Sequence, residues 1–182
     1  LAIERMGSGQ FMIEARGRAA HVGRAFGDGV SAVNALAERL LRIAEMADPG
    51  VGRIVSVGPL EGGGATNAVP DRARAWGNAR FPTPEVSDQI QRDLAALATP
   101  NAECADGRAA IQVHRSFNRP AKPKTPAVER LALAARRAAE DLGQPLPFAA
   151  TGGVCDGNMM QDAGLPTIDT LGVRGGGLHT PE

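Results

Sequence analysis

Residues 72–81 read RARAWGNARF, and their pattern is the strongest local indication of how the chain folds. Small residues alternate with larger, mostly polar residues, which is the pattern of a β-strand whose two faces have different surroundings. One face is small enough to let helices lie close to it, and it consists of Ala73, Ala75, Gly77 and Ala79. The other face carries Arg72, Arg74, Trp76, Asn78 and Arg80. The segment therefore predicts a strand in a sheet that is covered by helices on one side.

Five further elements flank this strand. Alternating residues predict other strands, apolar residues at helical spacing predict a helix, and Thr83-Pro84 is typical of an N-cap followed by the first helical residue. The expected order is a strand at 9–17, a helix at 31–47, strands at 53–60 and 72–81, a helix from Pro84, and a strand marked by Ile111, Val113 and Phe117. This is the order of the ferredoxin-like β-α-β-β-α-β fold, an antiparallel sheet with both helices on one face.

The chain divides after this unit. We expect residues 1–117 to form one α+β domain, and residues 118–124, which contain two prolines, to be a linker. Beyond it we expect a helix capped by Thr125-Pro126, a strand at 148–150, a helix at 155–163 and a strand at 166–171. These elements are too few to bury both faces of a sheet, so residues 118–182 are interpreted as part of a larger α/β domain.

The composition excludes several classes of protein. The 182 residues contain 20 Lys and Arg against 20 Asp and Glu, so the net charge gives no electrostatic footprint for nucleic acid or an anionic membrane. No stretch approaches the roughly 20 apolar residues of a membrane span. Two cysteines do not make a disulfide framework. We expect no nucleic-acid or membrane partner and a cytoplasmic location. A periplasmic or secreted location stays open because the sequence begins at Leu1 without Met.

Local chemistry alone leaves the candidate functional residues ambiguous. His21 lies in a glycine-flanked loop after a strand, where either a functional or a solvated histidine is found. His179 follows three glycines, but catalytic zinc usually needs three protein ligands. Arg80 and Arg119 could each bind a carboxylate with the planar guanidinium, or could simply be solvated.

Four segments, taken together, resemble the zinc peptidases that include glutamate carboxypeptidase, acetylornithine deacetylase, succinyl-diaminopimelate desuccinylase and aminoacylase. They are residues 17–23 (GRAAHVG), 62–70 (GGGATNAVP), 151–158 (TGGVCDGN) and 171–182 (LGVRGGGLHTPE). Any one of them is a weak signal, but four in order across nearly the whole chain are a specific one. The Arg119-Pro120 step and the glycine-rich ending look most like the glutamate carboxypeptidase branch.

This resemblance implies a split catalytic domain into which a ferredoxin-like lid is inserted, and the lid also forms a homodimer. Residues 1–117 match the lid, and residues 118–182 match the last part of the catalytic domain. The complete enzyme would hold two zinc ions per subunit, of which His179 matches a ligand. The other ligands and the general base would precede Leu1, so we expect a fragment that is inactive by itself.

The resemblance also implies roles for residues of the substrate site. His21 matches a lid histidine that reaches into the partner subunit and stabilises the oxyanion, and Asn67 matches an asparagine that contacts substrate across the dimer. Arg80 and Arg119 match arginines that can hold the terminal carboxylate of the substrate. A turn whose backbone lies against the substrate is matched by Gly152 and Gly153.

The expected activity is hydrolysis of an amide bond to an amino acid with a free carboxylate, by a di-zinc, glutamate carboxypeptidase-like enzyme. One alternative is an N-acyl-amino-acid deacylase of the deacetylase or desuccinylase branch. Another is a non-catalytic dimerisation fragment. Intact His21, Asn67 and His179 argue against a degenerate scaffold, which needs none of them, but they do not argue against truncation.

Overall fold

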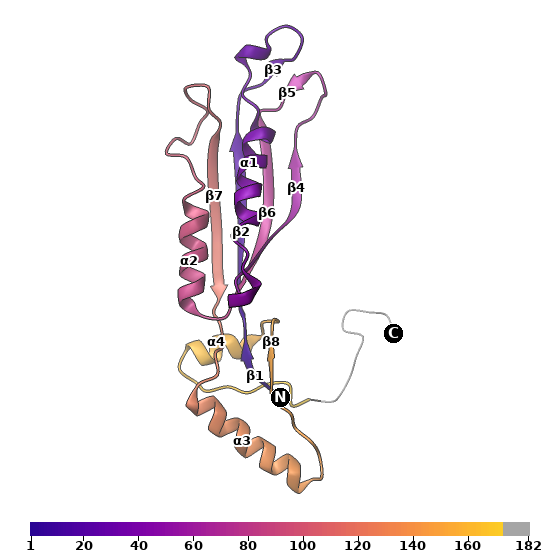
Figure 1. Cartoon of the computed structure of the whole chain (residues 1–182), viewed down its shortest axis with the longest axis vertical. Coiled ribbons are helices and arrows are strands. Elements are labelled where there is room, and N and C mark those ends of the chain that lie inside the picture. The colour runs from indigo at the N-terminus through magenta and orange to yellow at the C-terminus, as the bar shows by residue number, and fades with distance from the viewer. Residues whose placement is uncertain (173–182) are drawn as a thin grey trace.

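The computed structural model describes residues 1–172, so the predicted zinc ligand His179 lies outside the described residues. The molecule is elongated: a four-stranded sheet with two helices occupies most of its length, and a smaller body lies at one end (Figure 1).

The sheet has the ferredoxin-like topology that the sequence predicts. Its strands are β2 (Gly7–Arg16), β4 (Ile54–Gly62), β6 (Arg72–Phe81) and β7 (Ala110–Arg119), in the spatial order β4-β6-β2-β7. All neighbouring pairs are antiparallel, and β2 pairs with β6 from Gly7↔Phe81 to Arg16↔Arg72. The helices are α1 (Ala32–Ala44) and α2 (Pro84–Ala95). Short 3-10 turns occur at Phe26–Asp28 and Pro49–Val51.

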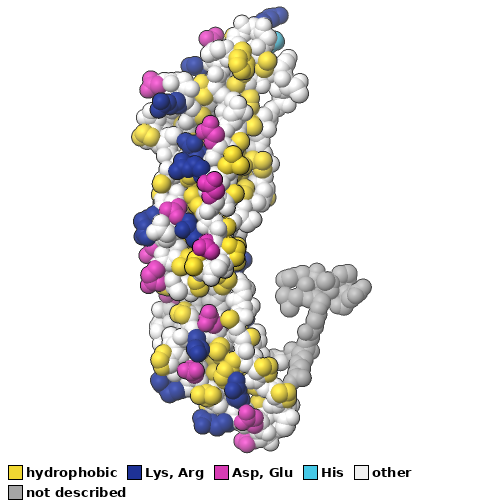
Figure 2. Space-filling model, in the orientation of Figure 1, with side chains coloured by type: hydrophobic (Ala, Val, Ile, Leu, Met, Phe, Trp, Pro, Cys, Tyr) yellow, Lys and Arg dark blue, Asp and Glu magenta, His cyan; other side chains and the backbone are white. Residues whose placement is uncertain are grey.

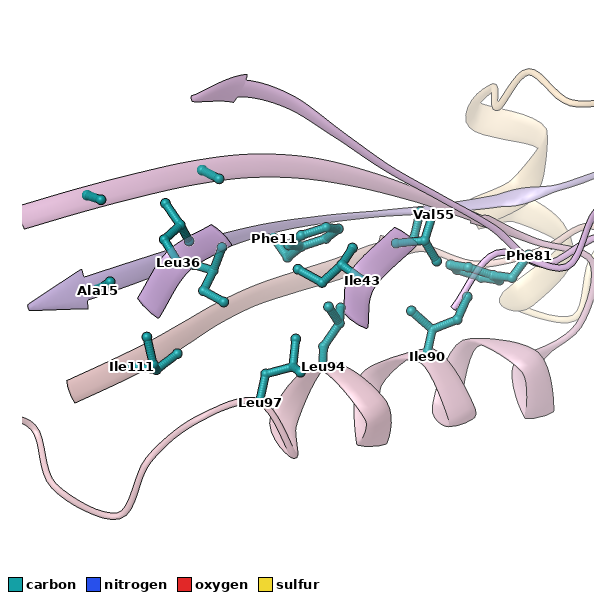
Figure 3. Packing of buried hydrophobic residues seen from close by; sticks show 14 of the residues in the cluster. Phe11, Ala15, Leu36, Ile43, Val55, Phe81, Ile90, Leu94, Leu97 and Ile111 are labelled. Carbon is teal, nitrogen blue, oxygen red and sulfur yellow. The ribbon is translucent and has the colours of Figure 1, made fainter. Parts of the chain in front are cut away.

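Both helices pack on the face of the sheet that carries the small residues of β6. Ala73, Ala75 and Ala79 are at most 2% exposed. Figure 3 shows how the larger apolar side chains of the helices meet the sheet at this face; they include Leu36 and Ile43 of α1 and Ile90 and Leu94 of α2. The face of small residues therefore positions the hydrophobic core, as the alternation in residues 72–81 predicts.

Helix starts are set by local side chains. Thr83 Oγ1 accepts the Val86 N–H at 3.5 Å at the start of α2, where proline occupies the first turn. The same arrangement recurs at α3 (Pro126–Asp141), where Thr125 Oγ1 accepts the Val128 N–H at 3.3 Å. Each cap satisfies a backbone donor that has no partner within its helix, so the Thr-Pro pairs are sufficient to predict both starts.

The helix-free face of the sheet holds a buried ion-pair cluster. The side chain of Glu14 is 5% exposed, and its carboxylate accepts hydrogen bonds from Arg74 at 2.9 and 3.0 Å and from Arg16 at 3.4 Å. Burial by itself would raise the pKa of Glu14, but the Arg74 hydrogen bonds and the charges of both arginines outweigh it, and the pKa is lowered below 4.5.

The smaller body is built around two parallel strands, β1 (Ala2–Arg5) and β8 (Ala149–Thr151). Helices α3 and α4 (Asp156–Asp162) lie in the same body (Figure 1). The sequence patterns predict β8 and both helices but not β1. Because β1 pairs with β8, the first residues of the chain lie in this body. The division of the chain into domains at residue 117 stays a prediction.

The strand expected at 166–171 is wrong. In this segment the structure has one isolated antiparallel bridge, between Ala2 and Asp169. Two local features explain the difference: Thr170 adopts a left-handed backbone with φ of 64°, and the Thr167 carbonyl accepts a hydrogen bond from the Lys122 side chain at 2.8 Å. The apolar residues that suggested a strand therefore belong to an irregular segment that runs past β1.

The tight contact beneath β6 can be tested with Gly77→Ala. A Cβ at this position would lie 2.1 Å from the Phe11 ring, and Phe11 is 3% exposed, so the ring has little room to move. We expect the free energy of unfolding to fall by about 1–3 kcal/mol in urea denaturation. The matched control is Gly58→Ala on β4, where the nearest atom would be 3.9 Å away, and a change within about 0.5 kcal/mol is expected there. Equal losses in both variants would contradict the packing argument.

The Glu14 cluster predicts a specific acid response. Since the folded-state pKa lies below 4.5, the cluster contributes its full stability above that pH and loses it as the pH falls through the folded pKa. Glu14→Gln should therefore have a lower Tm than the unsubstituted protein at neutral pH, and the gap should narrow between about pH 5 and pH 3. The control is Glu38→Gln, whose parent carboxylate is 73% exposed. A gap that stays constant with pH would rule out the proposed role of Glu14.

Candidate functional site

Two of the predicted site residues meet at one end of the sheet, which we call the tip. It is formed by the paired short strands β3 (Ala20–His21) and β5 (Ala68–Val69), and the Val22 N–H donates to the Asn67 carbonyl at 2.9 Å. The exposed His21 ring accepts the Gly23 N–H on Nδ1 at 3.1 Å. The neutral ring therefore carries its proton on Nε2, which leaves an N–H donor facing away from its own loop.

Other predicted site residues gather at the opposite end, which we call the base of the sheet. On the helix-free face, Ser8 is the register partner of Arg80 on one side and of Arg119 on the other. Register partners in an antiparallel pair share a face. With strands about 4.8 Å apart, the Cα atoms of the two arginines lie roughly 10 Å apart.

The Arg80 guanidinium is oriented by one hydrogen bond, while another of its nitrogens has no partner among the described residues. Its Nε donates to Asn78 Oδ1 at 2.9 Å, and Asn78 Nδ2 donates to Ser8 Oγ at 3.4 Å. The Arg80 Nη1 atom is buried and has no hydrogen-bond partner among residues 1–172. Leaving a buried guanidinium nitrogen without a hydrogen-bond partner costs free energy.

The turn that contains Gly152 and Gly153 also lies at the base. The Met6 N–H, one residue before β2, donates to the Thr151 carbonyl at 3.1 Å, and a Cβ on Gly152 would lie 3.9 Å from Met6 Sδ. Arg119 Nη1 pairs with Asp156 Oδ1 at 3.3 Å, just after the turn, but both side chains are exposed and the pair contributes little stability.

The candidate residues thus form two groups at opposite ends of one sheet. The arginines and the glycine turn lie at the base, while His21 and Asn67 lie at the tip, beyond the end of the ten-residue strand β2. At about 3.3 Å per residue, that strand separates the groups by roughly 30 Å. No side chain spans such a distance, so one copy of the chain cannot bring the two groups to the same substrate.

The structure adds polar residues that the sequence analysis did not single out. Asn158 is fully buried and joins three segments: its side chain donates to the Met6 carbonyl at 3.1 Å and the Pro120 carbonyl at 2.8 Å, and accepts the Cys155 N–H at 3.1 Å. Lys122 is also fully buried and lies beside Asp169. The chain has only two lysines, against 18 arginines, but nothing in the sequence indicated that one of them is internal.

The part of the chain that the structure describes has no cluster of metal-ligating side chains and no membrane-spanning helix. Within residues 1–172 there is no group of three or more His, Cys, Asp or Glu side chains placed to hold a metal ion. No helix in this part of the chain has the length and apolar character needed to cross a bilayer. On the face shown in Figure 2, acidic and basic side chains are interspersed, with no large patch of one sign.

This fold, an antiparallel sheet with two helices on one face, belongs to the α+β class. Residues 3–104 match the family model of the M20 peptidase dimerisation domain. The chain therefore belongs to this family, and the resemblance to the peptidase family is confirmed at that level. The glutamate carboxypeptidase branch stays a prediction.

Individual relatives agree with the family match. The chain is 28% identical over 172 residues to the uncharacterized protein YqjE of Bacillus subtilis (strain 168), covering 90% of the chain and 43% of that protein. Aminopeptidase PepT from Bacillus cereus superposes with a TM-score of 0.74 at 26% identity, over 91% of this chain and 43% of that one. A tripeptidase from Staphylococcus aureus gives a TM-score of 0.75 at 23% identity, with the same two coverages of 91% and 43%, and shows the shared fold. The chain spans less than half the length of these relatives.

Asn158 should be essential for joining the two parts of the molecule. Asn158→Ala leaves two carbonyls and one N–H without their partner, and each buried group left unpaired costs about 1–3 kcal/mol. We expect a clear loss of unfolding free energy in urea denaturation. Asn34→Ala, at an exposed position of α1, is the control and should change stability by less than about 0.5 kcal/mol. A similar small effect at Asn158 would contradict its linking role.

Proposed function

We propose that the chain is the lid and the last catalytic segment of a di-zinc metallohydrolase. The enzyme acts as a homodimer through the lid and cleaves the amide bond to an amino acid with a free carboxylate, as a glutamate carboxypeptidase does. The observation that carries this proposal is the separation of the candidate residues. Because the tip and the base lie roughly 30 Å apart, a complete site needs the tip of one subunit at the base of the other.

The base supplies the carboxylate subsite in this proposal. Arg80 and Arg119 lie on either side of Ser8, and the Arg80 Nη1 atom lacks a partner among the described residues. A guanidinium binds a carboxylate through two parallel hydrogen bonds, which fixes both the position and the orientation of the substrate. The backbone of the Gly152-Gly153 turn would lie along the same substrate, next to the scissile amide.

The tip supplies the electrophilic assistance. The His21 Nε2–H of the partner subunit would donate to the carbonyl oxygen of the scissile amide and stabilise the negative charge that develops there. Asn67 lies on the neighbouring segment of the same tip and would contact the substrate from that side. Both residues act across the dimer in this proposal.

Zinc enters the proposal through the resemblance alone. The described residues do not fit a zinc ion, since none of their His, Cys, Asp and Glu side chains form a group of three. His179, the one ligand that the resemblance assigns to this chain, lies outside the described residues. We propose that the chain by itself is inactive.

A small peptide is the second candidate substrate. The structure at 26% identity is that of an aminopeptidase, PepT, and this favours a short peptide over an acyl-amino acid. A tripeptide also ends in a free carboxylate and so suits the same arginines. Values of kcat/KM for the full-length protein would separate the candidates, with a tripeptide, an acylated glutamate, an acetyl amino acid and a succinyl amino acid as substrates.

The role of His21 can be tested by His21→Ala in the full-length protein. Loss of an oxyanion donor should lower kcat by roughly 10²–10³-fold and leave the bound zinc unchanged. The control is His114→Ala, which removes an exposed histidine from β7 and should leave kcat as it was.

Action across the dimer gives a second readout. Mixing inactive His21→Ala subunits with inactive Arg80→Met subunits should restore activity, since each mixed dimer contains one site with an intact base and an intact tip. Unchanged kcat in His21→Ala would contradict the role assigned to His21. Absence of restored activity in verified mixed dimers would contradict action across the dimer.

A further inference from the structure

The junction between the sheet and the smaller body consists of two chain segments lying side by side. One runs from β1 into β2 and the other follows β7. They are paired at Arg5 and Lys122, whose backbones exchange hydrogen bonds: the Arg5 N–H donates to the Lys122 carbonyl at 2.9 Å and the Lys122 N–H to the Arg5 carbonyl at 2.8 Å. Each of the two segments therefore contributes one cationic residue, and the two residues lie directly opposite each other.

Both cations bind one carboxylate. Arg5 Nε lies 3.0 Å from each oxygen of Asp169, and Arg5 Nη2 donates to Oδ1 at 2.5 Å. Lys122 Nζ lies 3.3 Å from Asp169 Oδ2. Asp169 belongs to the irregular segment beyond α4, so three distant parts of the chain meet here.

The cluster is buried, and the hydrogen-bond donors of its lysine all have partners. The Lys122 side chain has no exposed surface, and its ammonium group also donates to the Ala2 carbonyl at 3.2 Å and the Thr167 carbonyl at 2.8 Å. An ammonium has three donors, so a carboxylate and two carbonyls satisfy it. Burial would raise the pKa of Asp169, but the Arg5 and Lys122 hydrogen bonds outweigh it and hold that pKa below 3.8.

Arg5 connects this cluster to the glycine turn. Its Nη1 donates to the Gly153 carbonyl at 2.7 Å, while the rest of the guanidinium is held by Asp169. The Cys155 sulfur, two residues further on, lies 3.7 Å from Asp169 Oδ2. The direction of the Gly153 carbonyl is therefore set by a guanidinium whose own position depends on the junction.

We propose that Arg5, Asp169 and Lys122 are positioning residues that hold the Gly152-Gly153 turn at the base of the sheet and so set the affinity for substrate. This inference rests on the proposed function, in which the turn lies along the substrate. None of the three residues touches the reacting atoms. Loosening the turn weakens binding in the ground state and the transition state alike, which raises KM and leaves kcat nearly unchanged.

The experiment uses Arg5→Lys in the full-length protein. Lysine keeps the charge but loses the planar fork, so it cannot bind Asp169 and the Gly153 carbonyl in the same way. The matched control is Arg53→Lys, which changes another largely buried, ion-paired arginine, bound to Asp93 of α2. The measurements are kcat and KM for the best substrate of the panel, and amide hydrogen exchange of residues 151–158.

We expect Arg5→Lys to raise KM by about tenfold with kcat within about twofold, and to speed exchange of residues 151–158 by about tenfold, since it removes a charge-assisted hydrogen bond. Arg53→Lys should change neither. Asp169→Asn, as a second variant, should act in the same direction.

Amide exchange of residues 151–158 that is no faster than in Arg53→Lys would overturn the inference, whether or not the enzyme is active on the panel. Faster exchange with an unchanged KM in an active enzyme would also overturn it. If the protein hydrolyses no substrate of the panel, the proposed function fails, and the exchange data alone decide whether the cluster holds the turn.

Discussion

The antiparallel pairing of β2 with β6 is the interaction on which the rest of the structure depends. It runs without a break over ten residues and places the small side chains of β6 under both helices. The approach is so close that Gly77 has no room for a Cβ beside Phe11. The same pairing sets the length of the molecule, because its two ends carry the tip and the base. The strand pair therefore determines which of the candidate residues lie together in one chain and which lie far apart.

The junction with the smaller body is stabilised by a different kind of interaction. The sheet packs through apolar contacts, whereas the junction is held by buried polar groups: Asn158, Lys122 and Asp169 together tie both chain connections to the segment around α4. Buried hydrogen bonds and ion pairs are directional, and their loss leaves partners unsatisfied. Such a junction permits few relative orientations of the two parts, so it holds the candidate arginines of the sheet and the glycine turn of the smaller body in a defined arrangement.

The sequence predicts correctly the features that depend on residues close together in the chain, and it fails for those that depend on remote segments. Alternation over residues 72–81 and the Thr-Pro caps are decided by neighbours in the chain, and both predictions are confirmed. By contrast, β1 was missed and the strand at 166–171 was wrong. The parallel pair of β1 and β8 joins residues almost 150 positions apart, so it leaves no local pattern in the sequence. The apolar residues at 166–171 likewise do not show that the Thr167 carbonyl accepts a hydrogen bond from Lys122 instead of from a neighbouring strand.

By itself the sequence determined the class of the fold, the starts of two helices and the motifs that indicate the family, because each depends on short-range spacing along the chain. It also indicated His21, Asn67, Arg80, Arg119 and the glycine turn as candidates, although it could not say how they are arranged. Only the tertiary structure decided that these residues divide into two groups at opposite ends of a sheet, and that a buried cluster of two cations and one carboxylate lies behind the turn. Distances across strands and the burial of a lysine result from the pairing of remote segments, which spacing in the sequence does not encode.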